Sequence, residues 1–589
     1  MKKLIYICLI LLFNNTLRAQ NDDWLTWFEK SGGFETPRYD KTIEYSQKLA
    51  NTSPLIEYTS FGKSPQGRDL PLLIVDKNKN FTPESVRKSG NAVLLIEACI
   101  HAGETEGKDA GLMLIRDIVI NNKYPDLLDH VTILLIPIFN VDGHERFSPY
   151  NRINQNGPKE MGWRTTAQNL NLNRDFIKAD APEMQQWLKI YSSWLPDFFI
   201  DVHTTDGADY QYTITYGMQT LGNMNIKHTN WQKKYLGEIE EMLKKDNVLM
   251  FPYVSFRRWH DPRSGLIQGI APPRYSTGYS SVQNRPGLLI ETHMLKDYKT
   301  RVEATYHMIR HTIEIMNNDY EYLVKINREA DIEVASKEFR SKELAVSYKT
   351  STDSSIVLFK GIDYEIIKSD LTGDLWFVYK KEPRDFNIVS FDKQEVVYKV
   401  KLPEAYIIPV EWNQVIERLA FHGIQYKTLK EPKEIEVEMI RFNNVNYANS
   451  SFEGRQMIQD FTTQEFKTRK EFPAGSAVVE MNQRTAQVIA HLLEPIAPDS
   501  YVRWGFFNPI FERKEYVETY VMEKMAREMI VKNPELKNEY EKAVADNPEI
   551  YNNQYAKLFW FFARTPYWDQ QLNLYPIGKI FDNSQLNSL

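Results

Sequence analysis

The run AVLLIEACIHAGETEGKDAGLMLI, from Ala92 to Ile115, contains the change of pattern that decides the fold. Its first nine residues are almost continuously apolar, as expected for a strand that is covered on both faces of a sheet. From Gly107 onward the apolar residues recur three and four positions apart, which indicates an amphipathic helix. The turn between strand and helix carries His101, Glu104 and Glu106. The stretch therefore predicts a strand, a turn rich in reactive side chains, and a helix.

Four further apolar runs lie between residues 39 and 317, and helical patterns separate them. The runs are LPLLIVD, VTILLIPIF, DFFIDVH and GLLIET, at residues 70–76, 131–139, 197–203 and 287–292. Helical spacing of apolar residues is found at 107–122, 181–195 and 231–246. Strands that alternate with helices in this way predict an α/β fold.

The chain is 589 residues long, which exceeds the size that one hydrophobic core usually organises. A long helical pattern at residues 301–331 closes the first region, and short alternating runs rich in Thr, Val and Tyr follow it. We expect a first, catalytic domain at residues 20–330, a β-rich accessory domain at 331–402, and an α/β to helical region at 403–589.

The N-terminal segment MKKLIYICLILLFNNTLRAQ has two lysines, an apolar run and a small residue at Ala19, which together predict a signal peptide at residues 1–19. The apolar run is about half of the roughly 20 residues that a membrane-spanning helix needs. We therefore expect an exported protein, periplasmic or extracellular, with no membrane span after signal removal. An uncleaved membrane anchor is the alternative.

The net charge argues against one class of partner, and the cysteine content argues against one type of catalysis. The formal net charge of -6 gives no extended positive field, so nucleic acid is not expected as a partner. Cys8 lies in the predicted signal peptide, which leaves Cys99 as the single cysteine of the mature chain. Because Cys99 lies in an apolar run, we expect a small buried residue rather than a catalytic thiol.

Polar side chains gather where the predicted strands end. His101 and Glu104 follow the second strand, His203 closes the fourth, and Glu291 closes the fifth. Ligand crevices of open α/β sheets lie beyond the carboxyl ends of the strands, so these groups can converge. Alone, His101 would fit a hydrogen-bonded structural histidine. Two histidines and one carboxylate are what a catalytic zinc takes from a protein, so we predict one zinc ion bound by His101, Glu104 and His203.

Four segments, HAGE, WRTTAQNLNLNRDF, DVH and LLIETHML, resemble in order and spacing the zinc metallocarboxypeptidase family of carboxypeptidases A and B. The resemblance covers roughly residues 40–320 and implies a mixed, mostly parallel sheet flanked by helices. It implies a secreted exopeptidase that cleaves the last residue from a peptide with a free C-terminal carboxylate. It also implies the same three zinc ligands, with Glu291 as the general base that activates a zinc-bound water.

The segment WRTTAQNLNLNRDF supplies further residues by this resemblance. Arg164 is expected to stabilise the oxyanion, while Asn173 and Arg174 are expected to bind the terminal carboxylate of the substrate. Arginines in ordinary surface ion pairs are the alternative. Asn171 departs from the family pattern, because many relatives have an aspartate there that orients a zinc-bound histidine. An amide adds no negative charge, so ligand basicity is expected to be lower here.

The family also places a mobile tyrosine over the substrate, and two tyrosines precede Glu291 at a suitable distance. These are Tyr275 and Tyr279, of which we favour Tyr279. The alternative is an aromatic loop residue that packs on the protein surface.

Two other functions remain open from the sequence. A zinc amidase of the same fold, acting on peptidoglycan stem peptides or another non-standard amide, would need the same residues. A peptide-binding protein that uses its C-terminal half as a recognition module is the other. Aromatic segments at residues 503–516 and 557–576 would suit such a surface, although packed core is favoured for them. Glu291 and all three predicted zinc ligands are present, which favours an enzyme.

Overall fold

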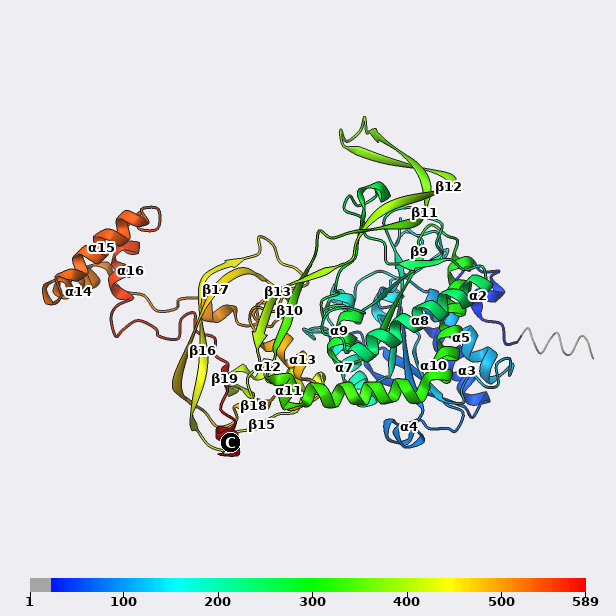
Figure 1. Ribbon diagram of the computed structural model, residues 1–589, viewed down its shortest axis with the longest axis horizontal. Coiled ribbons are helices and arrows are strands. Elements are labelled where there is room, and N and C mark those ends of the chain that lie inside the picture. Colours follow the sequence, from blue (N-terminus) through cyan, green and yellow to red (C-terminus); the bar gives the residue numbers. More distant parts are fainter. Residues whose placement is uncertain (1–22, 589) are drawn as a thin grey trace, which may run out of the picture.

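The computed structural model describes residues 23–588 (Figure 1). The predicted signal peptide lies outside these residues, so its prediction stands without structural evidence. Within residues 23–588, no helix combines the length and the apolar character needed to cross a bilayer.

An eight-stranded mixed sheet forms the centre of the first region, in the order β1-β2-β4-β3-β5-β9-β6-β7. Its strands are β1 (Ile56–Lys63), β2 (Asp69–Val75), β3 (Ala92–Ala98), β4 (Val131–Ile136), β5 (Phe198–Thr205), β6 (Ile214–Met218), β7 (Met250–Pro252) and β9 (Gly287–His293). The neighbours β4, β3, β5 and β9 run parallel, whereas β2 is antiparallel to β4 and β6 is antiparallel to β9. All five predicted strands are present, and the prediction of a mixed, mostly parallel sheet is confirmed.

Helices cover both faces of this sheet. The longer ones are α3 (Tyr39–Thr52), α5 (Glu106–Val119), α7 (Pro182–Trp194), α8 (Ile226–Lys245) and α10 (Tyr298–Ala335), and the shorter ones are α2 (Trp27–Lys30), α4 (Pro83–Ser89), α6 (Val141–Glu145) and α9 (Ser276–Val282). Apolar side chains of α5, α8 and α10 share one core with the sheet, and those of α7 and α9 share another. Continuous apolar strands are stable here because both of their faces are buried.

The turn after β3 has the form that its sequence predicts. Cys99 is buried with a left-handed backbone (φ 59°), and the chain then turns before α5 begins at Glu106. Glu106 lies in the first turn of α5 and pairs with the buried Arg301 at 2.7 Å. Glu106 also accepts from Thr204 Oγ1 of β5 at 3.0 Å, so both of its carboxylate oxygens are engaged, and the ligand positions fall to His101 and Glu104.

Residues 331–588 form several helices and three further sheets, one of which also includes β8 from the first region. The sheets are β10 (Glu343–Thr350) with β13 (Gln394–Lys401); β11 (Ser355–Lys368) with β12 (Leu375–Phe391) and β8 (Leu266–Ile267); and β15 (Lys427–Thr428), β18 (Ala477–Glu480), β14 (Ala405–Ile408), β19 (Gly578–Ile580), β16 (Lys433–Tyr447) and β17 (Ile458–Phe472). The helices are α11 (Lys337–Arg340), α12 (Asn413–Phe421), α13 (Ala486–Leu493), α14 (Thr519–Lys532), α15 (Glu535–Asp546) and α16 (Gln554–Phe562). This β-rich and then helical order agrees with the predicted fold class.

The two halves share a hydrophobic core. Trp187 of α7 belongs to the same buried cluster as Ile408 of β14, Leu492 of α13 and Trp504. The predicted boundary at residue 330 falls inside α10, which continues to Ala335 and reaches the second half (Figure 1). Packing is therefore continuous across that boundary, and the division into domains remains a prediction.

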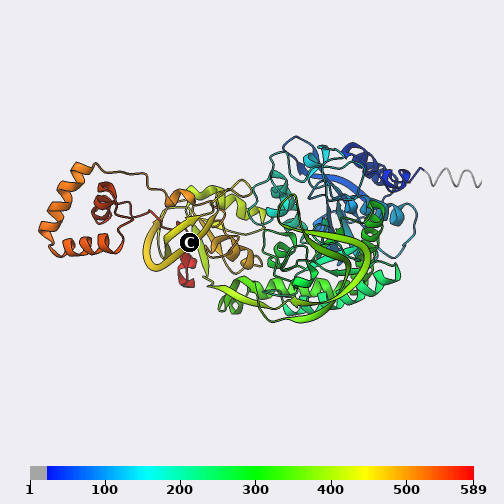
Figure 2. The same cartoon turned by 90° about the horizontal axis from the view of Figure 1, so that it is seen from above.

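Aromatic residues of the C-terminal half are mostly packed inside. Trp504 and Phe507 are fully buried in the shared core, and Trp560 lies in a separate small core of the α14–α16 group. That group lies at the far end of the molecule from the first region (Figure 2). These aromatic rings serve packing, as the sequence favoured.

Candidate active site

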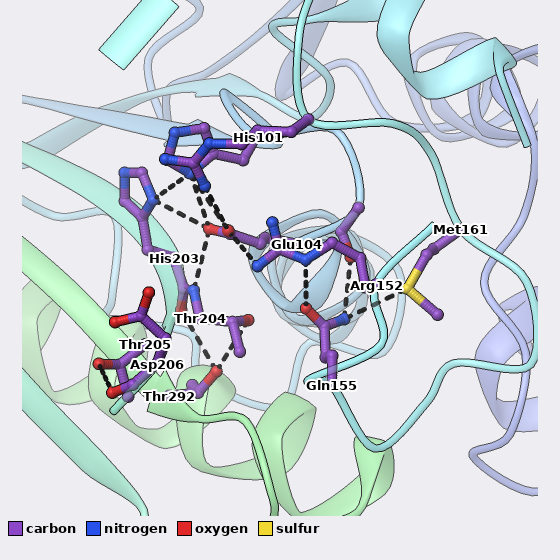
Figure 3. Close-up of polar contacts among 12 residues, drawn as sticks. His101, Glu104, Arg152, Gln155, Met161, His203, Thr204, Thr205, Asp206 and Thr292 are labelled. Carbon is purple, nitrogen blue, oxygen red and sulfur yellow. Dashed lines mark hydrogen bonds and ion pairs between the residues drawn. The ribbon is translucent and has the colours of Figure 1, made fainter. Parts of the chain in front are cut away.

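His101, Glu104 and His203 converge at the carboxyl ends of β3 and β5 (Figure 3). The Nδ1 atoms of the two histidines lie 3.1 Å apart, and each lies about 3 Å from a carboxylate oxygen of Glu104, at 3.1 Å for His101 and 2.9 Å for His203. Ligand atoms about 2.1 Å from a tetrahedral zinc lie roughly 3.4 Å from one another. The three side chains therefore have the separation that a shared zinc ion requires.

The outer nitrogens of both histidines are already engaged. His101 Nε2 donates to Asn171 Oδ1 at 3.2 Å, and His203 Nε2 donates to Asp201 Oδ2 at 2.8 Å. Asn171 Oδ1 also accepts from the backbone N–H of Asn173, which identifies it as an acceptor. With both Nε2 atoms protonated, both Nδ1 lone pairs face the Glu104 carboxylate. Such a cluster of acceptors fits a cation at its centre.

The protonation states of His101 and Glu104 favour the same interpretation, whereas the Asp201 carboxylate outweighs burial and raises the pKa of His203 well above its ordinary value, so a metal ion would have to displace a proton from His203. Burial lowers the pKa of His101 to about 3, so the imidazole stays neutral at pH 7. Burial opposes ionisation of Glu104, but His101 and the Arg152 guanidinium outweigh it and hold the pKa of this carboxyl well below its ordinary value. A neutral imidazole and an ionised carboxylate are the forms that bind zinc.

Two residues around the ligands escaped the sequence analysis. Asp201 precedes His203 by two positions on β5, so the two side chains share a face, and this spacing was a usable signal. Arg152 donates to Glu104 Oε1 at 2.6 Å from an irregular loop, where no periodicity marks it. Gly103 leaves room for it, because a Cβ there would lie 2.9 Å from Arg152 Cγ.

Glu291 lies next to His203, as predicted. The two residues are direct register partners on the parallel strands β5 and β9. Burial raises the pKa of Glu291 to about 8, and the nearby Glu104 carboxylate adds to this. Arg285, the arginine that precedes β9, binds Asp331 at 2.8 Å and does not pair with Glu291. Glu291 is thus placed at the ligand cluster as a strongly basic carboxylate.

The arginines of the WRTTAQNLNLNRDF segment gather at the same edge. Arg164 Nη1 lies 3.7 Å from Glu104 Oε1. Burial lowers the pKa of Arg164; the nearby charge of Arg174 also lowers it, and that of Glu291 raises it. Arg174 donates to the carbonyl of Asn173 at 2.6 Å and lies over the Tyr275 ring at 4.6 Å. The side-chain oxygen of Asn173 is buried and has no hydrogen-bond partner within residues 23–588. The segment therefore presents cations and an amide beside the ligand cluster.

The structure contradicts the expectation that Tyr279 covers the substrate. Its ring is fully buried against Trp187 and Tyr191, and its hydroxyl bonds to His422 Nδ1 at 2.9 Å. His422 comes from the C-terminal half, so this contact was invisible to local sequence patterns. Tyr275, the other candidate, is partly exposed and lies beside Arg174.

A cavity of about 420 Å³ adjoins the site. Leu289, two residues before Glu291 on β9, lines it together with Tyr253, whose pKa is raised by burial and by Glu291. The other lining side chains are apolar or neutral, among them Met218, Leu236 and Ile270. In the part of the chain that the structure describes, no charged side chain lines this cavity.

Comparisons with known proteins give the class and the family. Residues 42–268 match a family model described as zinc carboxypeptidase. Carboxypeptidase 2 of Trichophyton equinum is 23% identical over 493 residues, which cover 81% of this chain and 85% of the relative. Carboxypeptidase 2 of Trichophyton rubrum is 22% identical over 509 residues, which cover 82% and 88%.

Among solved structures, a metallo-carboxypeptidase from Burkholderia cenocepacia is 15% identical with a TM-score of 0.37, covering 48% of this chain and 70% of its own. Carboxypeptidase A from Helicoverpa armigera is also 15% identical, with a TM-score of 0.35, covering 50% and 73%.

The protein is a peptidase, a hydrolase of peptide bonds. Residues 42–268 match the family model of the zinc carboxypeptidases, as the sequence motifs predicted. The family depends on zinc, and His101, Glu104 and His203 are a group able to hold it.

Proposed function

We propose that the protein is an exported zinc metallocarboxypeptidase that hydrolyses the C-terminal peptide bond of peptides, with Glu291 as the general base. The convergence of two Nδ1 lone pairs and an ionised carboxylate beside Glu291 carries this proposal. The motif at the N-terminus supports export.

His101, Glu104 and His203 would hold the zinc ion, which supplies acidification of a water molecule and polarisation of the scissile carbonyl. Glu291 takes the proton of the attacking water and passes it to the leaving amine. Burial raises the pKa of Glu291, and the positive charge of a zinc ion beside it would lower that pKa again, so that the ionised carboxylate can accept the proton. Asp201 and Asn171 keep the two histidines oriented throughout.

The segment WRTTAQNLNLNRDF would bind the substrate. Arg164, close to Glu104, stabilises the oxyanion that forms at the scissile carbonyl. Arg174 and Asn173 bind the terminal carboxylate, for which a guanidinium offers two parallel donors. Tyr275 lies over Arg174 and restricts its motion. A free carboxylate at this place selects exopeptidase cleavage over internal cleavage.

The cavity beside Glu291 would take the side chain of the departing residue. Its neutral and apolar lining favours aromatic and aliphatic residues, because a charged side chain would be buried there without a partner. The protein should therefore prefer C-terminal Phe or Leu to C-terminal Lys or Glu.

The decisive experiment measures hydrolysis of N-blocked dipeptides with a free C-terminus. A strong chelator should abolish activity and added zinc should restore it. Glu291→Gln should retain zinc and lose several orders of magnitude in kcat. Glu183→Gln is the matched control, because Glu183 is a buried carboxyl with a raised pKa in α7, away from the ligands. Near-normal turnover in Glu291→Gln would contradict the assignment of the base.

Substrate class and export need separate measurements. A mass-spectrometric screen of mixed peptides for loss of the last residue, with D-amino-acid stem peptides included, distinguishes a carboxypeptidase from an amidase acting on cell-wall peptides. Export is tested by fractionating the cells and sequencing the N-terminus of the mature protein, which should begin near residue 20.

A further inference from the structure

A second group of metal-binding side chains lies outside the active site, where the end of α8 meets α10. It consists of Asp246, which caps the C-terminus of α8, with His307 and His311 of α10. One ligand atom from each residue lies within 4.8 Å of the others. The two histidines are four residues apart on one helix, so they project from the same face.

Both histidines direct a nitrogen at the same carboxylate oxygen. His307 Nδ1 lies 3.0 Å from Asp246 Oδ2, and His311 Nε2 lies 2.6 Å from it. His307 Nδ1 is nevertheless buried and without a hydrogen-bond partner among residues 23–588. His307 Nδ1 is therefore close to the carboxylate but not aligned for a hydrogen bond with it. Two ligands of one metal ion have this arrangement, because each points at the ion and not at the other ligand.

A carboxylate lies at each ring nitrogen of His311. His311 Nδ1 donates to Glu314 Oε2 at 2.7 Å, and Nε2 donates to Asp246 Oδ2 at 2.6 Å. A metal ion that binds Nε2 would take the place of the proton on this nitrogen. Carboxylate, histidine and metal in a row are the usual arrangement around protein-bound zinc, because the carboxylate orients the ring and raises its basicity.

The guanidinium of Arg310, which is itself a cation, contacts both Asp246 and His311. Its Nη2 lies 3.1 Å from Asp246 Oδ2 and 2.9 Å from His311 Nε2. Arg310 has other contacts to keep, since its Nη1 lies 3.5 Å from Glu314 and its guanidinium lies 5.4 Å from the centre of the Tyr124 ring. It can therefore leave Asp246 when an ion binds.

We propose that Asp246, His307 and His311 form a second site for a divalent transition metal of the zinc class. Two imidazoles and one carboxylate suit zinc, whereas calcium and magnesium prefer oxygen ligands alone. The side chains of Asp246 and His307 are 24% and 32% exposed, so solvent can reach the site and supply a further ligand. A metal here ties the end of α8 to the helix that joins the two halves.

The test counts zinc in the purified full-length protein after incubation with zinc and gel filtration. The wild type should hold two zinc ions per chain, His101→Ala one, and the double variant His307→Ala/His311→Ala one. His130→Ala, an exposed histidine outside both groups, is the matched control and should hold two. One ion in the wild type, or two in the double variant, would overturn the proposal.

A second measurement covers the case in which the double variant folds poorly. In the His101→Ala background, added zinc should raise Tm, and Arg310→Leu should tighten this response at least tenfold by removing the competing guanidinium. No shift in Tm with zinc, or a weaker response in Arg310→Leu, would refute the second site. Peptidase activity of His307→Ala/His311→Ala should stay at the wild-type level, which keeps this test separate from that of the active site.

Discussion

Replacing Asp201 with asparagine should weaken zinc binding while leaving all three predicted ligands in place. Asp201 Oδ2 accepts from His203 Nε2 at 2.8 Å, and both side chains are almost completely buried. The asparagine keeps the size but removes the charge, and its amide group can present N–H in place of oxygen. His203 then loses the partner that holds its Nδ1 lone pair toward Glu104.

The size of the effect follows from the strength of that bond. A hydrogen bond to a charged group contributes about 1.5–3 kcal/mol, and about 1.4 kcal/mol corresponds to a factor of ten in affinity. Zinc should therefore bind roughly 10- to 100-fold more weakly to Asp201→Asn, which is the range typical of residues that orient a metal-bound histidine. Glu97 cannot take over, because burial is the main cause that raises its pKa well above the ordinary value, and this cause remains when the Asp201 charge is removed.

The assay is competition for zinc with a chromogenic chelator at pH 7.5, together with circular dichroism to verify the fold. Asp197→Asn is the matched control, because it is a buried aspartate just before β5 that bonds to Val93 and Asn327 instead. Asn171→Asp should shift affinity the opposite way by adding a charge next to His101. A zinc affinity of Asp201→Asn within about twofold of the wild type would refute the argument.

Three further predictions concern the surroundings of the site. Tyr279→Phe should lower Tm and leave kcat/KM unchanged. Tyr275→Ala should raise KM for peptides with a free C-terminus. The reverse result would restore Tyr279 as the residue that covers the substrate. An N-blocked dipeptide ending in Phe should be cleaved at least tenfold faster than one ending in Lys, and equal rates would contradict the neutral cavity. Burial lowers the pKa of His491 to about 4, while the unfolded chain titrates near 6.5, so the stabilising effect is complete above pH 6.5 and is lost as pH falls toward 4. The free energy of unfolding, measured by urea titration, should fall over that range by about 3 kcal/mol less in His491→Gln. Identical pH slopes of the two proteins would contradict this.

The part of the site that the sequence predicted depends on strand ends. His101, His203 and Glu291 each follow an apolar run, and parallel strands bring such ends to one edge of a sheet, so their convergence needed no long-range information. The same logic predicted the order of strands and helices in the first region. The family resemblance, and not the strand ends, implied that position 171 lies next to a histidine ligand, and Asn171 contacts His101.

The parts that the sequence missed depend on contacts between distant segments. Tyr279 is 143 residues from His422, and only the folded C-terminal half shows that the tyrosine is buried. Arg152 lies on an irregular loop with no period from which its direction could be predicted. The sequence likewise gave no reason to expect α8 and α10 to bring Asp246 to His307 and His311, because that meeting is set by helix packing.

The shared core has a consequence for how such a chain can change over generations. Glu453, in the loop between β16 and β17, accepts from the backbone N–H of Asn171, so a residue of the C-terminal half supports the segment that orients His101. A recombination event that exchanged the C-terminal half for an unrelated module would expose the apolar surface of α7 to water. It would also remove the hydrogen bond from Asn171 to Glu453. Inheritance of the two halves is therefore coupled, and insertions should accumulate at the projecting β11–β12 hairpin and the α14–α16 group instead (Figure 1).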